Sequence, residues 1–244
     1  MSDPRPTEAI TLAAIGDLHV SETCHNRYRA LFEEISDAAD VLALAGDLTN
    51  FGKIREAENL AEDLRALTIP TVGVLGNHDV EAGQTEEVLR ILEQAGVTFL
   101  DEQATVIEGV GFAGVKGFLG GFGRGELGAF GEDAIKAFVD ESRNEARKLE
   151  NALRALRTDR VVAVLHYAPV LGTCEGEPLE IYPFLGSSRL ANAIDRFDNV
   201  KAVVHGHVHR GTYRGETPGG VPVYNCARFV VEAEFDRPYA LIEV

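Results

Sequence analysis

Side chains able to bind metal ions are concentrated in five short motifs: GDLHV, GDLTN, GNHD, LHYAP and GHVH. The candidate residues they contain are Asp17, His19, Asp47, Asn77, His78, His166, His207 and His209. Carboxylate, imidazole and amide oxygen atoms are suitable ligands for divalent manganese, iron, nickel or zinc. Each motif alone has an ordinary explanation as a turn, a cap or a core histidine. Five of the seven histidines of the chain belong to these motifs, however, so one shared metal site explains the set better.

The segments before the motifs are expected to bring them together. Each motif follows an apolar run of strand length, at residues 10–15, 41–45, 71–75, 161–165 and 201–204. Amphipathic helical patterns, one carrying Tyr28, Leu31, Phe32 and Ile35 and one over 54–67, separate the first three runs. Strands that alternate with helices indicate βαβ units, and ligands bind at the carboxyl ends of such strands. We therefore expect the five motifs to meet at one edge of the fold.

The remaining chain predicts further elements of the same domain. Short strands are expected over 98–116, a long amphipathic helix over about 132–157, and strands at 221–225 and 239–244. A short helix should begin at Ser187 or Ser188, which are good N-caps. We expect a single domain over 1–244, with a glycine-rich loop and the long helix at about 117–157. The glycine-rich stretch, 117–131, is either a lid whose Arg124 contacts substrate phosphate or a surface loop.

Composition excludes several classes of protein. The net charge of -16 disfavours a protein that tracks duplex nucleic acid through its phosphates. The apolar runs are far shorter than the roughly 20 residues of a membrane helix, and the N-terminus lacks the pattern of a secretory signal. A cytoplasmic protein is therefore expected. The three scattered cysteines, Cys24, Cys174 and Cys226, predict neither a disulfide framework nor a structural zinc site.

Two familiar nucleotide-binding patterns are not supported. GVGFAG, at 109–114, matches GxGxxG but lacks the strand-turn-helix context that a dinucleotide site requires. The chain contains no GxxxxGK[ST] sequence, so a nucleoside-triphosphate loop is not expected either.

The order of the five motifs resembles the signature of the calcineurin-like metallophosphoesterase superfamily, and their style resembles its bacterial phosphodiesterase branch. The resemblance implies an α/β fold, a four-layer αββα sandwich of two mixed sheets flanked by helices. It implies that Asp17, His19 and His209 hold one metal ion and that Asn77, His166 and His207 hold the other. Asp47 would bridge the two ions, and His78 would face the substrate.

Physical chemistry is consistent with these implied roles. Two divalent ions roughly 3.5–4 Å apart can clamp an in-line displacement and convert a bridging water to hydroxide at neutral pH. Because only Asp17 and Asp47 are carboxylate ligands, the site stays positive and can attract phosphate into an acidic protein. From the position that the resemblance implies, His78 could stabilise the transition state or protonate the leaving oxygen. Asp79 either orients the His78 ring or forms a turn, and His205 is expected to be a supporting or core residue.

The expected function is hydrolysis of a phosphomonoester or phosphodiester of a small molecule or nucleotide, with two divalent metal ions. GDLTN lacks the GDxVDRG pattern of Ser/Thr protein phosphatases, which disfavours that branch. A DNA-repair nuclease and a non-catalytic scaffold on the same fold are the alternatives. Tyr167, Arg228 and Arg124 are further candidate substrate contacts. The sequence leaves the substrate, the metal and the oligomeric state open.

Overall fold

The computed structural model describes residues 9–244. Residues 1–8, which belong to the N-terminal segment predicted to lack the pattern of a secretory signal, lie outside this range. The first sheet has five strands in the order β11-β1-β2-β3-β4. β1 to β4 run parallel, and β11 pairs antiparallel with β1. The strands are β1 (Thr11–Ile15), β2 (Val41–Ala45), β3 (Thr71–Val74), β4 (Val97–Phe99) and β11 (Ala240–Glu243). The helices that connect strands of the first sheet are α1 (Arg29–Ala38), α2 (Ile54–Leu64) and α3 (Thr85–Gln94).

The second sheet has six strands in the order β5-β6-β7-β8-β10-β9. β6, β7, β8 and β10 are parallel, and the two edge strands are antiparallel to their neighbours. The strands are β5 (Ala104–Ile107), β6 (Val110–Val115), β7 (Val161–Leu165), β8 (Val200–His205), β9 (Arg214–Glu216) and β10 (Pro222–Asn225). The accompanying helices are α4 (Asp133–Ala155), α5 (Ser188–Ile194) and α6 (Arg228–Phe235).

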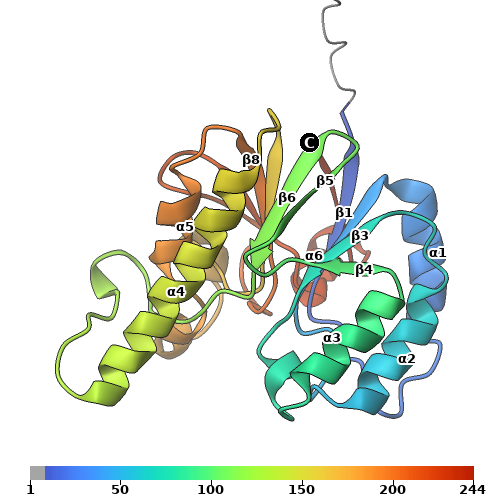
Figure 1. Ribbon diagram of the computed structural model, residues 1–244, viewed down its shortest axis with the longest axis horizontal. Coiled ribbons are helices and arrows are strands. Elements are labelled where there is room, and N and C mark those ends of the chain that lie inside the picture. The colour runs from blue at the N-terminus through green and yellow to red at the C-terminus, as the bar shows by residue number, and fades with distance from the viewer. Residues whose placement is uncertain (1–8) are drawn as a thin grey trace, which may run out of the picture.

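The central strands are apolar on both faces because each face packs against another layer. In β2, Val41 and Ala43 join the core between the two sheets, whereas Leu42 and Leu44 pack against α1, α2 and α3. The outer face of the second sheet packs against α4 and α5 through residues such as Leu149. Figure 1 shows the two sheets in the middle, with α1–α3 on one side and α4 and α5 on the other. The expected αββα sandwich is therefore confirmed.

Two helices were not anticipated. α3 carries an amphipathic pattern, with Val88 and Leu92 buried against the first sheet. α6 contains consecutive Phe229, Val230 and Val231, residue types that favour strands, yet it folds as a helix. Val231 reaches the core between the sheets, so tertiary packing outweighs local preference there. The expected long helix is present as α4, whereas the single-domain organisation stays a prediction.

The glycine-rich stretch is hydrogen-bonded to a second loop, which contains Pro183 and Gly186. Gly120 and Gly121 donate backbone hydrogen bonds to the carbonyls of Pro183 (3.1 Å) and Gly186 (2.9 Å). The short helix α5 begins directly after, with Ser187 as its N-cap.

All three cysteines are free thiols. Over residues 9–244, no helix combines the length and apolarity that crossing a bilayer requires.

Candidate metal centre

All eight residues from the five motifs lie at the carboxyl ends of β1, β2, β3, β7 and β8. Three overlapping groups of side chains have ligand atoms within 4.8 Å of one another: Asp17, His19 and His209; His19, Asp47 and His78; and Asp47, His166 and His207. Asn77 joins them because its Oδ1 lies 2.9 Å from His166 Nε2. The two sheets thus contribute to a single cluster, as the motif positions predicted.

The first group is built around the buried carboxylate of Asp17. His209 Nε2 lies 2.9 Å from Asp17 Oδ1, and His19 Nε2 lies 4.0 Å from the same oxygen. The backbone N–H of His207 also donates to both Asp17 oxygens, at 3.1 and 3.0 Å. Although burial raises the Asp17 pKa, the hydrogen bond from His209 and the nearby histidines outweigh it and lower the pKa overall. Asp17 is therefore ionised at neutral pH, as a metal ligand must be.

His19 gives the clearest sign that this cluster is made for a cation. Both of its ring nitrogens are buried, and neither has a hydrogen-bond partner in the described chain. Nε2 faces Asp17 Oδ1 at 4.0 Å and Asp47 Oδ2 at 3.9 Å, beyond hydrogen-bond range on both sides. Burial lowers the His19 pKa to about 4, so the ring is neutral at pH 7 with a lone pair available. A buried orphan nitrogen is costly unless an ion occupies the space between these groups.

The group of Asp47, His166 and His207, together with Asn77, contains three acceptors held against one another. His166 Nδ1 lies 3.0 Å from the carbonyl of Ala45, so this nitrogen carries the proton and Nε2 presents its lone pair. That lone pair faces Asn77 Oδ1 at 2.9 Å and Asp47 Oδ1 at 3.4 Å. Three acceptors at these separations repel one another but suit ligands of one ion, which lie roughly 3 Å apart when metal bonds are about 2.1 Å. The donor set therefore fits a divalent cation.

Asp47 lies between the two groups. Its Oδ1 faces His166, and its Oδ2 faces His19 and, at 4.0 Å, His78 Nε2. Its side chain is buried, and Oδ1 also accepts the backbone N–H of His78 at 2.8 Å. A carboxylate whose oxygens face two different ligand groups has the geometry that bridging would require.

The backbone at the cluster is strained. Asp17, His19, Asp47 and His207 all have positive φ values, of 60°, 46°, 49° and 70°. For non-glycine residues this left-handed conformation costs on the order of 1–2 kcal/mol each, and such strain concentrates at functional sites. These left-handed turns follow β1, β2 and β8, three of the five strands that carry the motifs.

Glycines before the ligands make room for this arrangement. A Cβ on Gly46 would lie 2.5 Å from His166 Nδ1, and one on Gly206 would lie 2.6 Å from Asp17 Oδ2. A Cβ on Gly76 would overlap the backbone and side chain of Asp47. In the GDLTN, GNHD and GHVH motifs the glycine is therefore required by the close approach of another motif.

His78 is held by the backbone and not by its neighbour Asp79. Its Nδ1 donates to the carbonyl of Asn50 at 2.6 Å, which leaves Nε2 facing the cluster. The fully buried carboxylate of Asp79 instead accepts the N–H groups of Leu48, Thr49 and Gly76 and the Thr49 hydroxyl. Of the two roles considered for Asp79, the structure supports the turn-forming one: it ties the GDLTN and GNHD loops together. Asn50 ends the GDLTN motif, but it holds His78 through its backbone carbonyl, a role that its side chain does not signal.

His205 and the candidate substrate residues have different surroundings. His205 is buried, with Nε2 bonded to Thr173 Oγ1 at 2.9 Å, as expected for a core histidine. The buried ring of Tyr167 lies 4.5 Å from that of His207. Arg228 donates from Nε to the Asp17 carbonyl at 3.0 Å and stacks on Phe229, whose ring is 4.8 Å from that of His209. Sequence reasoning missed Phe229, which no motif marks.

Arg124 is not brought to the cluster in the same way. It is exposed in a short 3-10 turn and lines a hollow of about 510 Å³ with Pro169, Leu171 and Glu216. None of the residues lining this hollow is a candidate metal ligand. The role of Arg124 in binding substrate phosphate stays a prediction.

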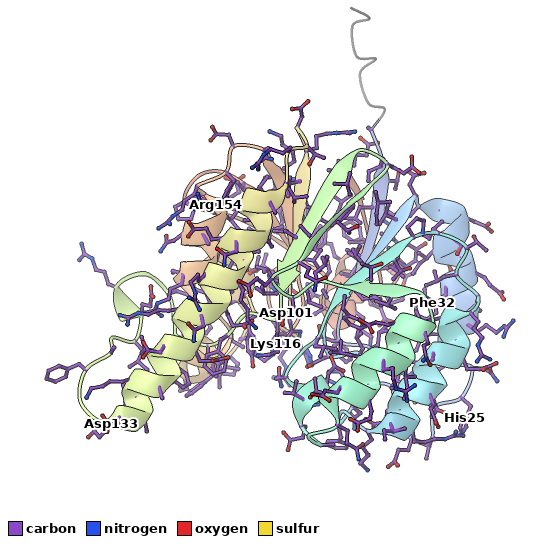
Figure 2. All side chains as sticks on the ribbon, in the orientation of Figure 1. His25, Phe32, Asp101, Lys116, Asp133 and Arg154 are labelled. Carbon is purple, nitrogen blue, oxygen red and sulfur yellow. The ribbon has the colours of Figure 1, made fainter. Side chains whose placement is uncertain are left out.

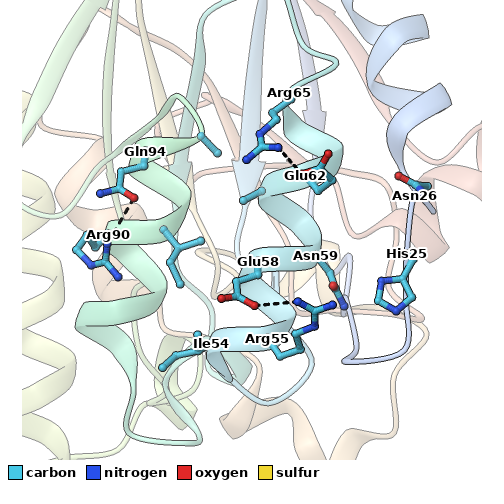
Figure 3. Close-up of a pocket in the computed structure, with 13 residues that line it drawn as sticks. His25, Asn26, Ile54, Arg55, Glu58, Asn59, Glu62, Arg65, Arg90 and Gln94 are labelled. Atoms are coloured by element: carbon cyan, nitrogen blue, oxygen red, sulfur yellow. Dashed lines mark hydrogen bonds and ion pairs between the residues drawn. The ribbon is translucent and has the colours of Figure 1, made fainter.

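A separate hollow of about 700 Å³ lies between α2 and α3, away from the cluster (Figure 3). Its arginines are engaged within the same helices: Arg55 pairs with Glu58, Arg65 with Glu62, and Arg90 with Gln94. Because these cations already have partners, the hollow offers no evident anion site.

The protonation of His209 predicts how metal binding depends on pH. Burial lowers its pKa, but the hydrogen bond and charge of Asp17 outweigh burial and raise the pKa overall. A metal ion held by His209 would displace this proton, so affinity should increase as pH rises through the His209 pKa, with protons released on binding. Calorimetric titrations with Mn²⁺ or Zn²⁺ between about pH 6 and 8 would measure both effects. His25→Ala, which removes an exposed histidine outside the cluster, is the control. Metal affinity that does not change with pH would contradict the prediction.

Comparisons with known proteins agree with this geometry. Residues 10–211 match the family model for calcineurin-like phosphoesterases. The chain is 23% identical over 218 residues to a 3′,5′-cyclic-nucleotide phosphodiesterase of Nostoc sp., covering 82% of this chain and 72% of that protein.

Solved structures show the same fold. The phosphopantetheinyl hydrolase of Mycobacterium tuberculosis has a TM-score of 0.66 at 18% identity, covering 96% of this chain and 95% of that one. A dimetal phosphatase from Danio rerio has a TM-score of 0.54 at 12% identity, covering 88% and 86%. With the family model matching from the start of β1 to beyond His209, the chain belongs to the calcineurin-like phosphoesterase family.

Proposed function

We propose that this protein hydrolyses a phosphomonoester or phosphodiester of a small molecule or nucleotide, using two divalent metal ions. The observation that carries the proposal is the orphaned, buried His19 ring between the carboxylates of Asp17 and Asp47. Asp17, His19 and His209 would hold one ion, and Asn77, His166 and His207 the other, with Asp47 shared between them. When bound, the ions supply positive charge and a water acidic enough to act as the nucleophile near neutral pH.

The charge of the site suits a phosphate anion. The proposed ligands include two carboxylates, Asp17 and Asp47, and five neutral donors, so two divalent ions leave the centre positive. Burial lowers the pKa of His207 to about 4, which keeps this ligand neutral at pH 7. A positive centre inside a protein with a net charge of -16 would draw phosphate locally while the surface repels long polyanions.

His78 is proposed to complete the reaction. Because Nδ1 is fixed on the Asn50 carbonyl, a protonated ring presents its Nε2–H to the side of the cluster where Asp47 Oδ2 lies, 4.0 Å away. From there it can donate the proton that an alkoxide leaving group needs. Tyr167 and Arg228, which pack against His207 and the Asp17 loop, remain proposed substrate contacts.

A metal-reconstituted assay tests the function. Protein loaded with Mn²⁺, Fe²⁺, Ni²⁺ or Zn²⁺ should hydrolyse at least one of bis(p-nitrophenyl) phosphate, p-nitrophenyl phosphate or a cyclic nucleotide. Preference for single-stranded DNA over all of these would favour the nuclease alternative. Inactivity on every substrate with both ions bound would favour a non-catalytic scaffold.

His78→Gln should separate proton donation from metal binding. We expect kcat to fall by about 10²-fold or more on an alkyl phosphodiester, with the metal content unchanged. On p-nitrophenyl esters the fall should be smaller, because p-nitrophenolate leaves without needing a proton. Metal content is measured by elemental analysis, and His25→Gln is the matched control. An equal fall on both kinds of ester would contradict the proton-donor role.

A further inference from the structure

A small cavity beside the metal centre has one apolar wall and one charged wall. It encloses about 190 Å³ between the ends of β3, β4 and β6 and the helices α3 and α4. Leu75, Leu89 and Phe99 contribute to the apolar wall, and Lys116, Glu145 and Lys148 to the charged one. An apolar cavity of about 150 Å³ can bind benzene, so this space has room for a group of that size.

The cavity adjoins the metal centre through both of its walls. Leu75 and Val80, which line it, bracket the segment that carries Asn77 and His78. On the other wall, the carbonyl of Lys116 accepts the backbone N–H groups of His166 (3.1 Å) and Tyr167 (3.0 Å). The Tyr167 ring in turn lies 5.3 Å from the ring of His166. Both walls of the cavity are thus connected to residues that carry or contact the candidate ligands.

The charged wall contains two lysines, and only Lys116 has unused hydrogen-bond donors. Lys148 is fully engaged, since its ammonium contacts Asp101 (3.0 Å) and Glu145 (2.9 Å). The other oxygen of Glu145 accepts the N–H of Gly117 at 2.9 Å. The acidic groups that line the cavity are thus already occupied. Figure 2 labels Lys116 and Asp101 at the centre of the molecule, between α4 and α3.

Lys116 has only weak partners. Its ammonium donates one hydrogen bond, to the Gly117 carbonyl at 3.2 Å, and lies 5.3 and 5.5 Å from the ring centres of Phe118 and Tyr167. Between residues 9 and 244, no carboxylate forms an ion pair with it. Burial lowers its pKa, although Glu145 and other acidic residues oppose the shift. Two of its three N–H donors are free for an acceptor that enters the cavity.

We propose that this cavity receives the leaving group of the substrate and that Lys116 selects an apolar leaving group bearing an acceptor oxygen, as a carboxylate or a carbonyl. The apolar wall would pack against the body of the group, and the spare ammonium donors would bind its oxygen. The inference rests on the proposed phosphoesterase function, because the ester phosphate must lie at the metal centre for its leaving group to reach Lys116.

Matched aryl esters test this selectivity on the metal-loaded protein. The substrates are phenyl phosphate, 4-acetylphenyl phosphate and 4-carboxyphenyl phosphate, which share a ring and differ in the acceptor. For Lys116→Met, the kcat/KM ratio of each oxygen-bearing ester to phenyl phosphate should fall by about tenfold relative to wild type, chiefly through KM. Comparing the same pair in both proteins cancels the intrinsic reactivity of the leaving groups. A larger fall for the carboxylate than for the ketone would assign the preferred acceptor.

Two further variants make the result specific. Lys116→Arg keeps a cation and should retain part of the preference. Lys148→Met removes the other ammonium of the charged wall, which is already paired with Asp101 and Glu145. This variant should change the kcat/KM ratios less than Lys116→Met does. Ratios unchanged in Lys116→Met would overturn the inference while leaving the phosphoesterase function intact.

Failure of the function itself is distinguishable. If the wild-type protein hydrolyses none of the three esters, calorimetric binding of the intact esters replaces kinetics. Tighter binding of 4-carboxyphenyl phosphate than of phenyl phosphate, lost in Lys116→Met, would support the cavity assignment. Equal binding of the two esters to the wild-type protein would refute it.

Discussion

Asp47→Asn is expected to lower phosphoesterase activity by on the order of 10³-fold or more and to reduce the bound metal below two ions per chain. One Asp47 oxygen faces His166 and the other faces His19, so the carboxylate serves both ligand groups. An amide offers one neutral oxygen and places an NH₂ group where the second acceptor was. The variant should therefore lose its shared ligand while its side chain keeps nearly the same volume.

Activity on bis(p-nitrophenyl) phosphate and metal content by elemental analysis measure the two effects together. Asp63→Asn is the matched control, because Asp63 is also buried and accepts a backbone N–H, that of Tyr28 at 3.0 Å, outside the cluster. The control should retain its metal and most of its activity. Two ions per chain in Asp47→Asn would argue against a bridging role.

Gly76→Ala should destabilise the metal-free protein by about 3 kcal/mol. The added Cβ would overlap the backbone nitrogen and Oδ1 of Asp47 and lie 2.8 Å from its Cγ. Asp47 cannot easily withdraw, because its φ of 49° is already strained and its Oδ1 is bonded to the His78 N–H. Relief would require the turns after β2 and β3 to separate.

Urea unfolding without metal isolates this packing effect from any loss of bound ions. Gly125→Ala provides the comparison, since Gly125 is exposed and a Cβ there meets nothing within 4 Å. It should change stability by no more than about 0.5 kcal/mol. A Gly76→Ala protein as stable as Gly125→Ala would mean that the two turns are not packed as tightly as described.

The cluster could be predicted from the sequence because five of the seven histidines fall in the motifs and each motif follows an apolar run. Asp17 and Asp47, for instance, come directly after a glycine at the end of a buried strand. Parallel strands bring their carboxyl ends to one edge, so the pattern alone placed these side chains together. The pairing of β11 with β1, by contrast, joins the two ends of the described chain and has no local signal.

Other features depend on contacts that no local pattern specifies. GNHD places His78 and Asp79 side by side, and sequence alone could not decide whether the carboxylate supports the imidazole. The carbonyl of Asn50 takes that position instead, because the turn after β2 folds over the turn after β3. Lys116 likewise looks like any lysine at a strand end; only the packing of α4 and Phe118 around it reveals its spare donors. α6 was missed for a similar reason, since Val231 is fixed by the core between the sheets.

The contact between Asp17 and His209 spans 192 positions of the chain. During synthesis, His209 is added to the chain 192 residues after Asp17. The group formed by Asp17, His19 and His209 does not exist before that moment. Any part of the two sheets that folds during synthesis before then forms with this group incomplete, so a metal ion held by the whole group would bind only after His209 has been added.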